Sequence, residues 1–197
     1  MAGATTVAFW FDPTCPFTWR TSRWLVDVAP RRGLDVDWRL MSLAILNEGK
    51  EIPEQFRALM GVGRSAGLVF QAVRDEHGVA ALARLYTEFG TRRHVQGADL
   101  GPDLLRASLA AAGLPEDLAV DGESRLPALA ASHAAGQARV GQESGSPITA
   151  IADGPGFFGP VVVPPPEGED GEKLFDALSL LSGVPAFSEL KRSRASF

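Results

Sequence analysis

Cysteine is nearly absent from this sequence, which contains one, Cys15, among 197 residues. A single thiol cannot form an internal disulfide, and it cannot supply a multi-cysteine metal site. Whatever redox chemistry Cys15 performs therefore needs a second sulfur from outside the chain. The sequence also lacks a phosphate-binding loop, a dinucleotide glycine fingerprint and zinc-ligand spacing, so we expect no metal site and no tightly bound cofactor.

Long hydrophobic runs and clusters of positive charge are missing as well. No apolar stretch approaches the ~18 to 20 residues that a membrane-spanning helix needs, and the first residues lack the basic start of a signal peptide. The net charge is -5, and the basic residues are scattered as single arginines or Arg-Arg pairs, unlike a nucleic-acid-binding surface. We expect a cytosolic protein that binds neither membranes nor nucleic acid.

The composition that remains is typical of a globular chain, with 45% hydrophobic and 22% charged residues. β-branched and aromatic residues predict a buried strand over 6–11, ended by Asp12-Pro13. Proline at a first helical position and an apolar periodicity predict a helix over 16–31. Alternating polar and apolar residues over 34–43 predict a second strand, which the intervening helix allows to pair in parallel with the first.

The middle of the chain changes to an alanine-, leucine- and arginine-rich helical pattern, which predicts a helical insertion over 53–141. Within it, 101–113 is typical of an amphipathic helix with a glycine stop. Beyond the insertion, the pattern predicts a strand over 146–152, a turn at 153–156, a returning strand over 157–163 and a last helix over 168–182.

This order of elements resembles an α/β thioredoxin-like (DsbA-like) fold with an inserted all-helical subdomain. The resemblance implies a thioredoxin-like domain built from 1–52 and 142–197, interrupted by the helical subdomain at 53–141. In such a fold, the cysteine at the start of the first helix faces a proline-led strand, to which we assign Ser146-Pro147. The resemblance implies a cis peptide bond there, with the backbone of Ser146 free to pair with an extended ligand.

Further motifs lie in residues 9–24 (FWFDPTCPFTWRTSRW), 41–48 (MSLAILNE), 53–57 (PEQFR), 93–94 with 96–97 (RH and QG), 112–115 (AGLP), 157–161 (FFGPV) and 189–192 (ELKR). Through these motifs nearly the whole chain resembles the actinobacterial DsbA-like proteins described as mycothiol-dependent nitroreductases. That family has Cys-Pro-Trp-Cys where this sequence has Cys15-Pro16-Phe17-Thr18, so the second thiol of the motif is replaced by a hydroxyl. The resemblance implies a mycothiol-like small thiol as co-substrate and nitro reduction as the family's activity.

Cys15 and Thr18 are the candidate catalytic residues. A thiol at a helix N-terminus faces unpaired amide groups and the positive end of the helix dipole, which can lower its pKa to roughly 3.5 to 7.5. The Thr18 hydroxyl can donate a hydrogen bond to that sulfur, but it cannot attack a mixed disulfide. Arg20 and Arg23 would favour the thiolate, and Asp12 would oppose it.

Residues around this motif form the candidate substrate-binding set. Phe17, Trp19, Trp10 and Trp38 suit a flat or apolar substrate, although tryptophans at such spacing also serve as core. His94 suits the binding of a carboxylate or the transfer of a proton, or a purely structural role, and Asn47 suits a contact at the subdomain interface. The set comprises Pro16, Phe17, Trp19, Asn47, His94, Ser146 and Pro147.

Three functional hypotheses remain open from the sequence. The first is a cytosolic thiol–disulfide oxidoreductase that works through Cys15 alone, with a small thiol as co-substrate and a small-molecule or protein disulfide as substrate. The second is a relative of kappa-type glutathione transferases and isomerases, in which Thr18 matters more than Cys15. The third is a non-catalytic ligand-binding protein. Exposed apolar residues of the insertion would serve a homodimer or a lid.

Overall fold

The computed structural model describes residues 4–120, 122–141 and 144–193. Its helices and strands follow the predicted alternation closely at both ends of the chain. They are β1 (Thr5–Phe11), α1 (Pro16–Arg32), β2 (Leu34–Leu40), α2 (Leu43–Leu46), α3 (Glu54–Gly90), η1 (Thr91–Val95), α4 (Pro102–Ala111), η2 (Glu116–Val120), η3 (Glu123–Arg125), α5 (Leu126–Val140), β3 (Ile148–Ile151), β4 (Gly156–Phe158) and α6 (Gly168–Ser182).

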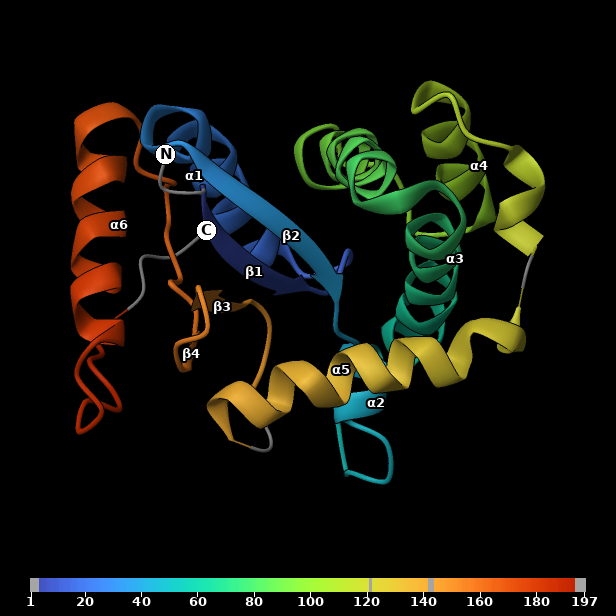
Figure 1. The fold of residues 1–197 in the computed structure, drawn as a ribbon. Coiled ribbons are helices and arrows are strands. Elements are labelled where there is room, and N and C mark those ends of the chain that lie inside the picture. Colours follow the sequence, from blue (N-terminus) through green and yellow to red (C-terminus); the bar gives the residue numbers. More distant parts are fainter. Residues whose placement is uncertain (1–3, 121, 142–143, 194–197) are drawn as a thin grey trace.

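A sheet with the strand order β2-β1-β3-β4 lies at the centre of the fold (Figure 1). β1 and β2 are parallel, with Phe11 opposite Leu40 at their carboxyl ends. β3 runs antiparallel to β1, and β4 runs antiparallel to β3. The parallel pair is connected through α1, as the dozen or more intervening residues allow. Cys15 follows the carboxyl end of β1 after a short loop, Asp12-Pro13-Thr14.

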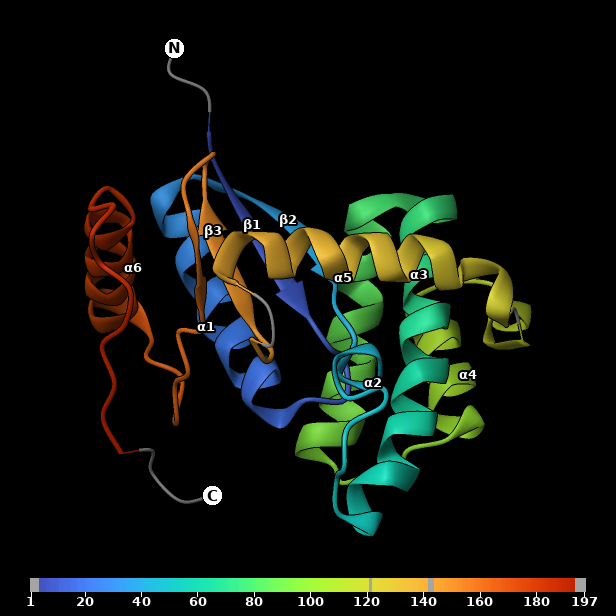
Figure 2. The same cartoon turned by 90° about the horizontal axis from the view of Figure 1, so that it is seen from below.

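The two faces of the sheet are covered by different helices, as the view in Figure 2 shows. Alternate residues of β1 point to opposite faces. Val7, Phe9 and Phe11 join the larger core with buried residues of α1 and α6, and Trp10 joins a smaller one on the other face. There α5 approaches so closely that a Cβ at Gly136 would lie 2.9 Å from Trp10 Cδ1. The sheet is therefore covered by α1 and α6 on one face and by α5 on the other.

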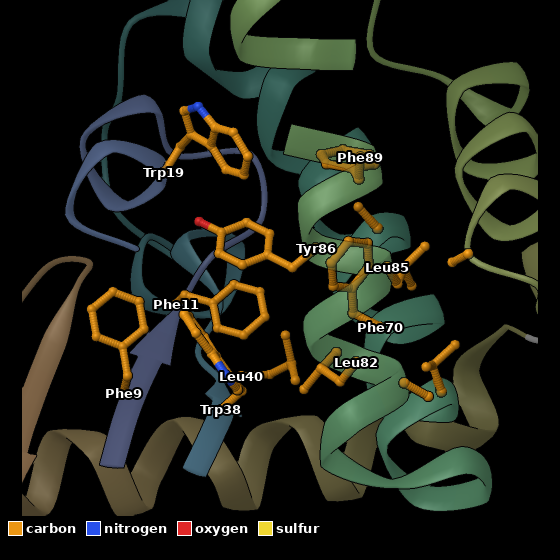
Figure 3. Close-up of a cluster of buried hydrophobic side chains, with 14 of the residues drawn as sticks. Phe9, Phe11, Trp19, Trp38, Leu40, Phe70, Leu82, Leu85, Tyr86 and Phe89 are labelled. Carbon is orange, nitrogen blue, oxygen red and sulfur yellow. The ribbon is translucent and has the colours of Figure 1, made fainter. Parts of the chain in front are cut away.

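α3 changes direction at Gly78, whose φ of 82° and ψ of 177° lie outside the helical region. Glycine adopts a positive φ without the steric penalty of a Cβ. The two halves of α3 then pack against each other, with Phe70 and Phe89 ring centroids 5.3 Å apart. Tyr86 stacks on Phe11 at 4.0 Å, so the helical region and β1 share one aromatic core (Figure 3).

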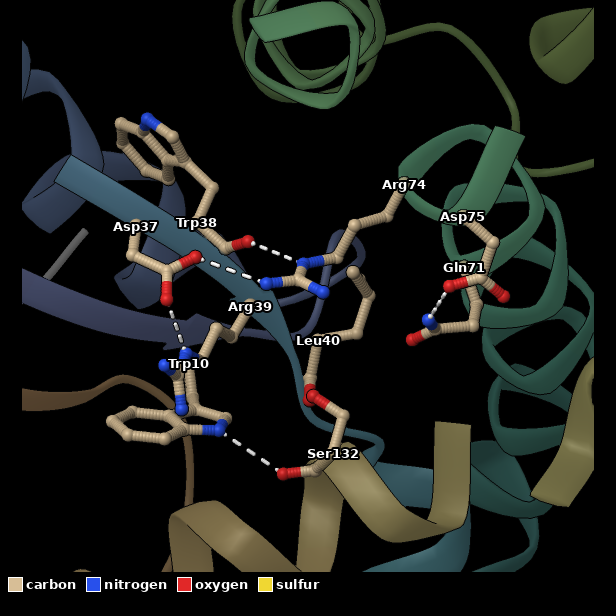
Figure 4. A network of polar contacts seen from close by, with 9 residues as sticks. All are labelled: Trp10, Asp37, Trp38, Arg39, Leu40, Gln71, Arg74, Asp75 and Ser132. Carbon is tan, nitrogen blue, oxygen red and sulfur yellow. Dashed lines mark hydrogen bonds and ion pairs between the residues drawn. The ribbon is translucent and has the colours of Figure 1, made fainter. Parts of the chain in front are cut away.

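Polar contacts also tie the predicted insertion to the sheet (Figure 4). The Trp10 indole donates to Ser132 O at 3.0 Å, and the Ser132 hydroxyl donates to Leu40 O at 2.6 Å. From α3, the Arg74 guanidinium contacts Asp37 at 3.0 Å. The predicted boundary between the helical subdomain and the thioredoxin-like domain, at 141 and 142, lies beside residues outside the described ranges. The two ends of the predicted thioredoxin-like domain, 1–3 and 194–197, also lie outside them.

Three predicted strands are longer than the observed ones, and the strand predicted over 146–152 is confined to Ile148–Ile151 of β3. The strand predicted over 34–43 ends at Leu40, because Ser42 caps α2 by accepting a hydrogen bond from Ile45 N–H at 3.3 Å. The strand predicted over 157–163 ends at Phe158, before Pro160, which has no N–H for ladder pairing. Across the described part of the chain, no helix combines the length and the apolarity that a membrane span requires.

Candidate active site

Cys15 occupies the N-cap position of α1, where its N–H donates to Asp12 O at 3.1 Å and Pro16 begins the helix. Cys15 is buried, with only 8% of the residue exposed to solvent. Its Sγ–H donates to the carbonyl oxygen of Ser146 at 3.8 Å. The Ser146–Pro147 peptide bond is cis. The structure therefore brings together the two ends of the predicted site, although 131 residues separate them in the chain.

Two buried hydroxyl groups lie beside the sulfur. Thr18 is completely buried and Ser146 is 6% exposed. Their Oγ atoms are 2.7 Å apart, and the N–H of Asp12 donates to Ser146 Oγ at 3.0 Å. Thr18 occupies the position of the second cysteine in the two-cysteine motif, and the hydrogen-bond partner of its hydroxyl is Ser146 Oγ.

Burial raises the pKa of the Cys15 thiol above its ordinary value, and the negative charge of Asp12 adds to the increase. Hydrogen bonds from the Thr18 hydroxyl and from the amides of Thr18 and Phe17 lower the pKa, but burial has the larger effect. The expectation of a lowered pKa is therefore wrong for this arrangement. Here the helix N-terminus stabilises the thiolate less than desolvation destabilises it, and the resting group is the protonated thiol.

Asp12 connects the loop before Cys15 to the start of α2. One carboxylate oxygen accepts from Thr14 N–H at 2.8 Å and from the Thr14 hydroxyl at 2.7 Å. The other oxygen accepts from Leu43 N–H at 2.8 Å. Burial raises the pKa of Asp12, and these hydrogen bonds oppose that increase. Sequence reasoning identified Asp12 only as an opposing charge, yet the aspartate followed by proline and threonine is the pattern of an Asx turn.

Of the two arginines that were expected to favour the thiolate, Arg20 acts on His94, whose pKa its charge lowers. Arg23 points away from the sulfur toward α3, where its guanidinium lies 4.0 Å from the Trp19 ring centroid and donates to Thr87 Oγ1 at 3.3 Å. Its pKa is lowered by burial. Arg23 therefore acts mainly in packing α1 against α3.

His94 lies beside the loop that precedes Cys15. Its Nε2 is 3.1 Å from the carbonyl oxygen of Pro13, and its ring stacks on Trp19 with centroids 5.8 Å apart. Burial lowers the pKa of His94 to about 4. The imidazole is neutral at neutral pH and can donate Nε2–H to Pro13 O. This geometry favours the structural role over the binding of a substrate carboxylate.

The lowered pKa of His94 predicts a loss of stability in mild acid. Because the unfolded chain takes up the proton first, the stabilisation is complete above pH 6.5 and is lost as the pH falls toward about 4. His94→Phe keeps a ring against Trp19 and should flatten the dependence of melting temperature on pH in that window. The same replacement at the exposed His77 should leave the slope unchanged. Equal slopes for wild type and His94→Phe would contradict the assignment.

The remaining predicted substrate-binding residues differ in their exposure and in their contacts. Pro16 is exposed, Phe17 is half-buried and Pro147 is buried beside Cys15. Asn47 donates its amide to Leu43 O at 2.8 Å and contacts Met60 Sδ at 3.8 Å, so it stabilises the turn after α2. The tryptophans are core residues, since Trp10, Trp19 and Trp38 are exposed by 6% or less.

The Ser146 carbonyl, expected to be free, accepts from the Cys15 thiol. Because a carbonyl oxygen has two lone pairs, a ligand can pair with Ser146 O through the second one or by displacing the thiol hydrogen. Within the described ranges, no three histidine, cysteine or acidic side chains lie close enough together to hold a metal ion.

Sequence reasoning missed Gly90 and Tyr86, two residues of α3 that pack against the aromatic residues beneath the site. Gly90, at the end of α3, lets the Trp19 ring approach the helix backbone, because a Cβ there would overlap that ring. Tyr86 is fully buried between Phe11 and Trp19, and its hydroxyl has no hydrogen-bond partner within the described residues. In the sequence, Gly90 is one of several glycines that interrupt the helical pattern, and no sequence signal indicated that the Trp19 ring packs against it.

Comparison with known proteins agrees with this geometry. An uncharacterised protein of Mycobacterium tuberculosis, Rv2286c, is 32% identical over 97% of this chain and 83% of its own. A probable DsbA oxidoreductase of Streptomyces coelicolor, SCO1869, superposes with a TM-score of 0.60 at 17% identity, covering 97% of this chain and 95% of its own. A 2-hydroxychromene-2-carboxylate isomerase superposes with a TM-score of 0.57 at 15% identity, covering 91% and 95%.

The two structural relatives confirm the predicted thioredoxin-like, DsbA-like fold with its helical insertion. The family model described as "Rv2466c-like: mycothiol-dependent nitroreductase Rv2466c" matches residues 14–192. Residues 14–192 include Cys15, Thr18, Ser146 and Pro147. The chain therefore belongs to the Rv2466c-like family of mycothiol-dependent nitroreductases.

Proposed function

We propose that this chain is a thiol–disulfide oxidoreductase that works through Cys15 alone, in the cytosol, with a mycothiol-like small thiol as co-substrate. The observation that carries the proposal is one sulfur at the start of α1, 3.8 Å from the carbonyl that precedes the Pro147 strand, in a chain with no second cysteine. Family membership supports a thiol-dependent redox enzyme. A lone thiol requires that the second thiol come from solution.

The reaction is a pair of thiol exchanges. Cys15, as thiolate, attacks the small-thiol sulfur of a mixed disulfide; a new disulfide forms, and the partner's thiol leaves as thiolate. A second small thiol then attacks the small-thiol sulfur bound to Cys15, and Cys15 leaves as thiolate. The products are the reduced partner and a disulfide of two small thiols, so both electrons come from the small thiol. Reduction of a nitro compound by this chain would likewise draw its electrons from external thiols.

The raised pKa of Cys15 slows both exchanges. A high pKa decreases the thiolate fraction that can attack, and the greater nucleophilicity of the thiolate compensates only in part, because the Brønsted coefficient is about 0.4–0.5. It also makes Cys15 a poor leaving group when the second small thiol attacks. We therefore expect both the formation and the release of the mixed disulfide on Cys15 to be slow at neutral pH.

The proposal is tested by intact-mass spectrometry after incubation with oxidised mycothiol, with bis(2-hydroxyethyl) disulfide as a second oxidised thiol. We expect one small-thiol adduct on the wild-type chain and none on Cys15→Ser. Thr18→Ala should still form the adduct, about tenfold more slowly, because a hydrogen bond to a charged sulfur is lost. A wild-type chain that forms no adduct with either disulfide would exclude the proposal.

A kappa-type transferase or isomerase activity is the second candidate, and the two hydroxyls beside the sulfur favour it. In that mechanism the sulfur of a bound small thiol is the nucleophile, and Thr18 would stabilise it. Glutathione or mycothiol conjugation to an aryl halide separates the candidates. Turnover retained by Cys15→Ser and lost in Thr18→Ala would assign the transferase mechanism, whereas loss in Cys15→Ser assigns the oxidoreductase.

A further inference from the structure

A cavity of about 360 Å³ lies between α1, β2, the second half of α3 and the end of α4. Val26, on its α1 side, lies about three turns beyond Cys15, roughly 16 Å at 1.5 Å per residue. The cavity is therefore separate from the candidate active site, and a small occupant does not reach the sulfur. Its wall includes Val26, Trp38, Ala83, Arg84, Glu88 and Ala112.

The wall is mainly apolar, and small side chains create the space. Ala83 and Ala112 each end at a methyl group, and Val26 is a large apolar residue that is left 46% exposed. Apolar surface in contact with water favours an apolar occupant. Because a cavity of about 150 Å³ takes up benzene, one of about 360 Å³ accommodates an aromatic ring with a short side chain.

Trp38 brings an unpaired hydrogen-bond donor to this cavity. The residue is only 6% exposed, and within the described ranges its side chain makes aromatic contacts but no hydrogen bond. Figure 4 shows the indole nitrogen at the outer end of the side chain, turned away from β2. The nitrogen is not one of the fully enclosed unpaired atoms of the described residues, so its N–H opens to the cavity. Such a donor in an apolar site fixes the position of an acceptor atom of the ligand.

The charges at the rim favour a negatively charged ligand. Arg84 is exposed, and no acidic side chain within the described ranges forms an ion pair with it. Glu88, one turn further along α3, lies 2.6 Å from Arg92 Nη1 instead. The charge of Glu88 is thereby compensated, whereas that of Arg84 is available to a carboxylate at the outer end of a ligand.

We propose that this cavity binds a small aromatic carboxylate that carries a carbonyl oxygen between its ring and its carboxylate. The ring packs against Val26 and Ala83, the carbonyl oxygen accepts from the Trp38 N–H, and the carboxylate pairs with Arg84. The inference goes beyond the proposed function, because this ligand is not a reactant in the thiol exchange at Cys15.

The proposal is tested by titrating the isotope-labelled chain with β-benzoylpropionate and following the indole N–H resonances by nuclear magnetic resonance. The Trp38 resonance should shift and saturate with a Kd on the order of 1 mM, as expected for an unoptimised ligand of this size. The indoles of Trp10 and Trp24 donate to Ser132 O and Gly171 O, so their resonances should stay in place. Phenylbutyrate, which has a methylene group instead of the carbonyl, should bind about three- to tenfold more weakly.

Two substitutions on α3 test the wall and the rim. Ala83→Leu should weaken binding by about tenfold or more, because the leucine side chain takes the space of the ring. Ala80→Leu is the matched control, since Ala80 is exposed on the same helix outside the cavity. Arg84→Gln should weaken binding about two- to fivefold, whereas Arg106→Gln, at an exposed arginine of α4, should bind as the wild type does.

A Trp38 resonance that does not saturate, or that shifts equally in Ala83→Leu, would overturn the proposal. Equal affinities for β-benzoylpropionate and phenylbutyrate would contradict the role of the Trp38 N–H. Cys15→Ser should bind the acid as the wild type does, although it forms no small-thiol adduct. Failure of the adduct to form therefore rejects the proposed function alone, and failure of the titration rejects this inference alone.

Discussion

Gly90→Ala should destabilise the fold by about 1–3 kcal/mol, the usual cost of inserting an atom into a packed core. A Cβ at this position would overlap Cε3 and Cζ3 of Trp19. The backbone itself tolerates alanine, since Gly90 has a φ of -66° and a ψ of -36°, and helix propensity favours alanine by up to about 1 kcal/mol. The overlap outweighs that gain, because the far end of a packed indole cannot move aside without leaving its neighbours.

Displacement of Trp19 should also alter the geometry of the active site. The indole stacks on His94 at 5.8 Å, and His94 Nε2 contacts Pro13 O in the loop before Cys15. We therefore expect Gly90→Ala to change the alkylation rate of Cys15 as well as the denaturant midpoint. Gly61→Ala, on the same helix, is the matched control, since no atom lies within 4 Å of its Cβ position. It should be neutral or stabilising, and equal effects of the two variants would contradict this account.

The sequence predicted most of the elements because their patterns are local. Proline at the start of α1, glycine after its end and the spacing of apolar residues in α6 each depend on nearby positions, and both helices begin and end within one residue of prediction. The prediction failed where a long-range contact decides the outcome. Leu43, expected in a strand, donates its N–H to Asp12 at the start of a short helix.

For the active site, the sequence identified the residues but not their burial or the direction of the pKa shift. The motif identified Cys15 and Thr18, and the fold resemblance identified Ser146-Pro147 from far along the chain. The direction of the Cys15 pKa shift could not be obtained from sequence, since it depends on how deeply neighbouring segments bury the sulfur. For the same reason, the sequence did not decide whether the tryptophans line the ligand surface or belong to the core. Burial results from packing between distant elements, and periodicity within one element does not determine it.

Asp12→Asn should make Cys15 more reactive and the fold less stable. The ionised carboxylate raises the pKa of the thiol, so removing its charge lowers that pKa and increases the thiolate fraction, and with it the alkylation rate, at a fixed pH below the pKa. The asparagine amide, by contrast, would turn a donor toward Thr14 N–H or Leu43 N–H, both of which now donate to the carboxylate. Such an unpaired buried donor costs about 1–3 kcal/mol.

The pH dependence of stability provides a second check on Asp12. Because burial raises its folded pKa above 3.8, the stabilisation by the neutral acid is present below pH 3.8 and is lost as the pH rises through the folded pKa. Asp12→Asn should lack that loss, which has the opposite sign to the acid-side loss from His94. Asp35→Asn removes the same charge at the opposite, exposed end of the sheet and should leave both the alkylation rate and the pH profile as in wild type. An alkylation rate that falls in Asp12→Asn would show that the carboxylate assists the thiol instead of suppressing its ionisation.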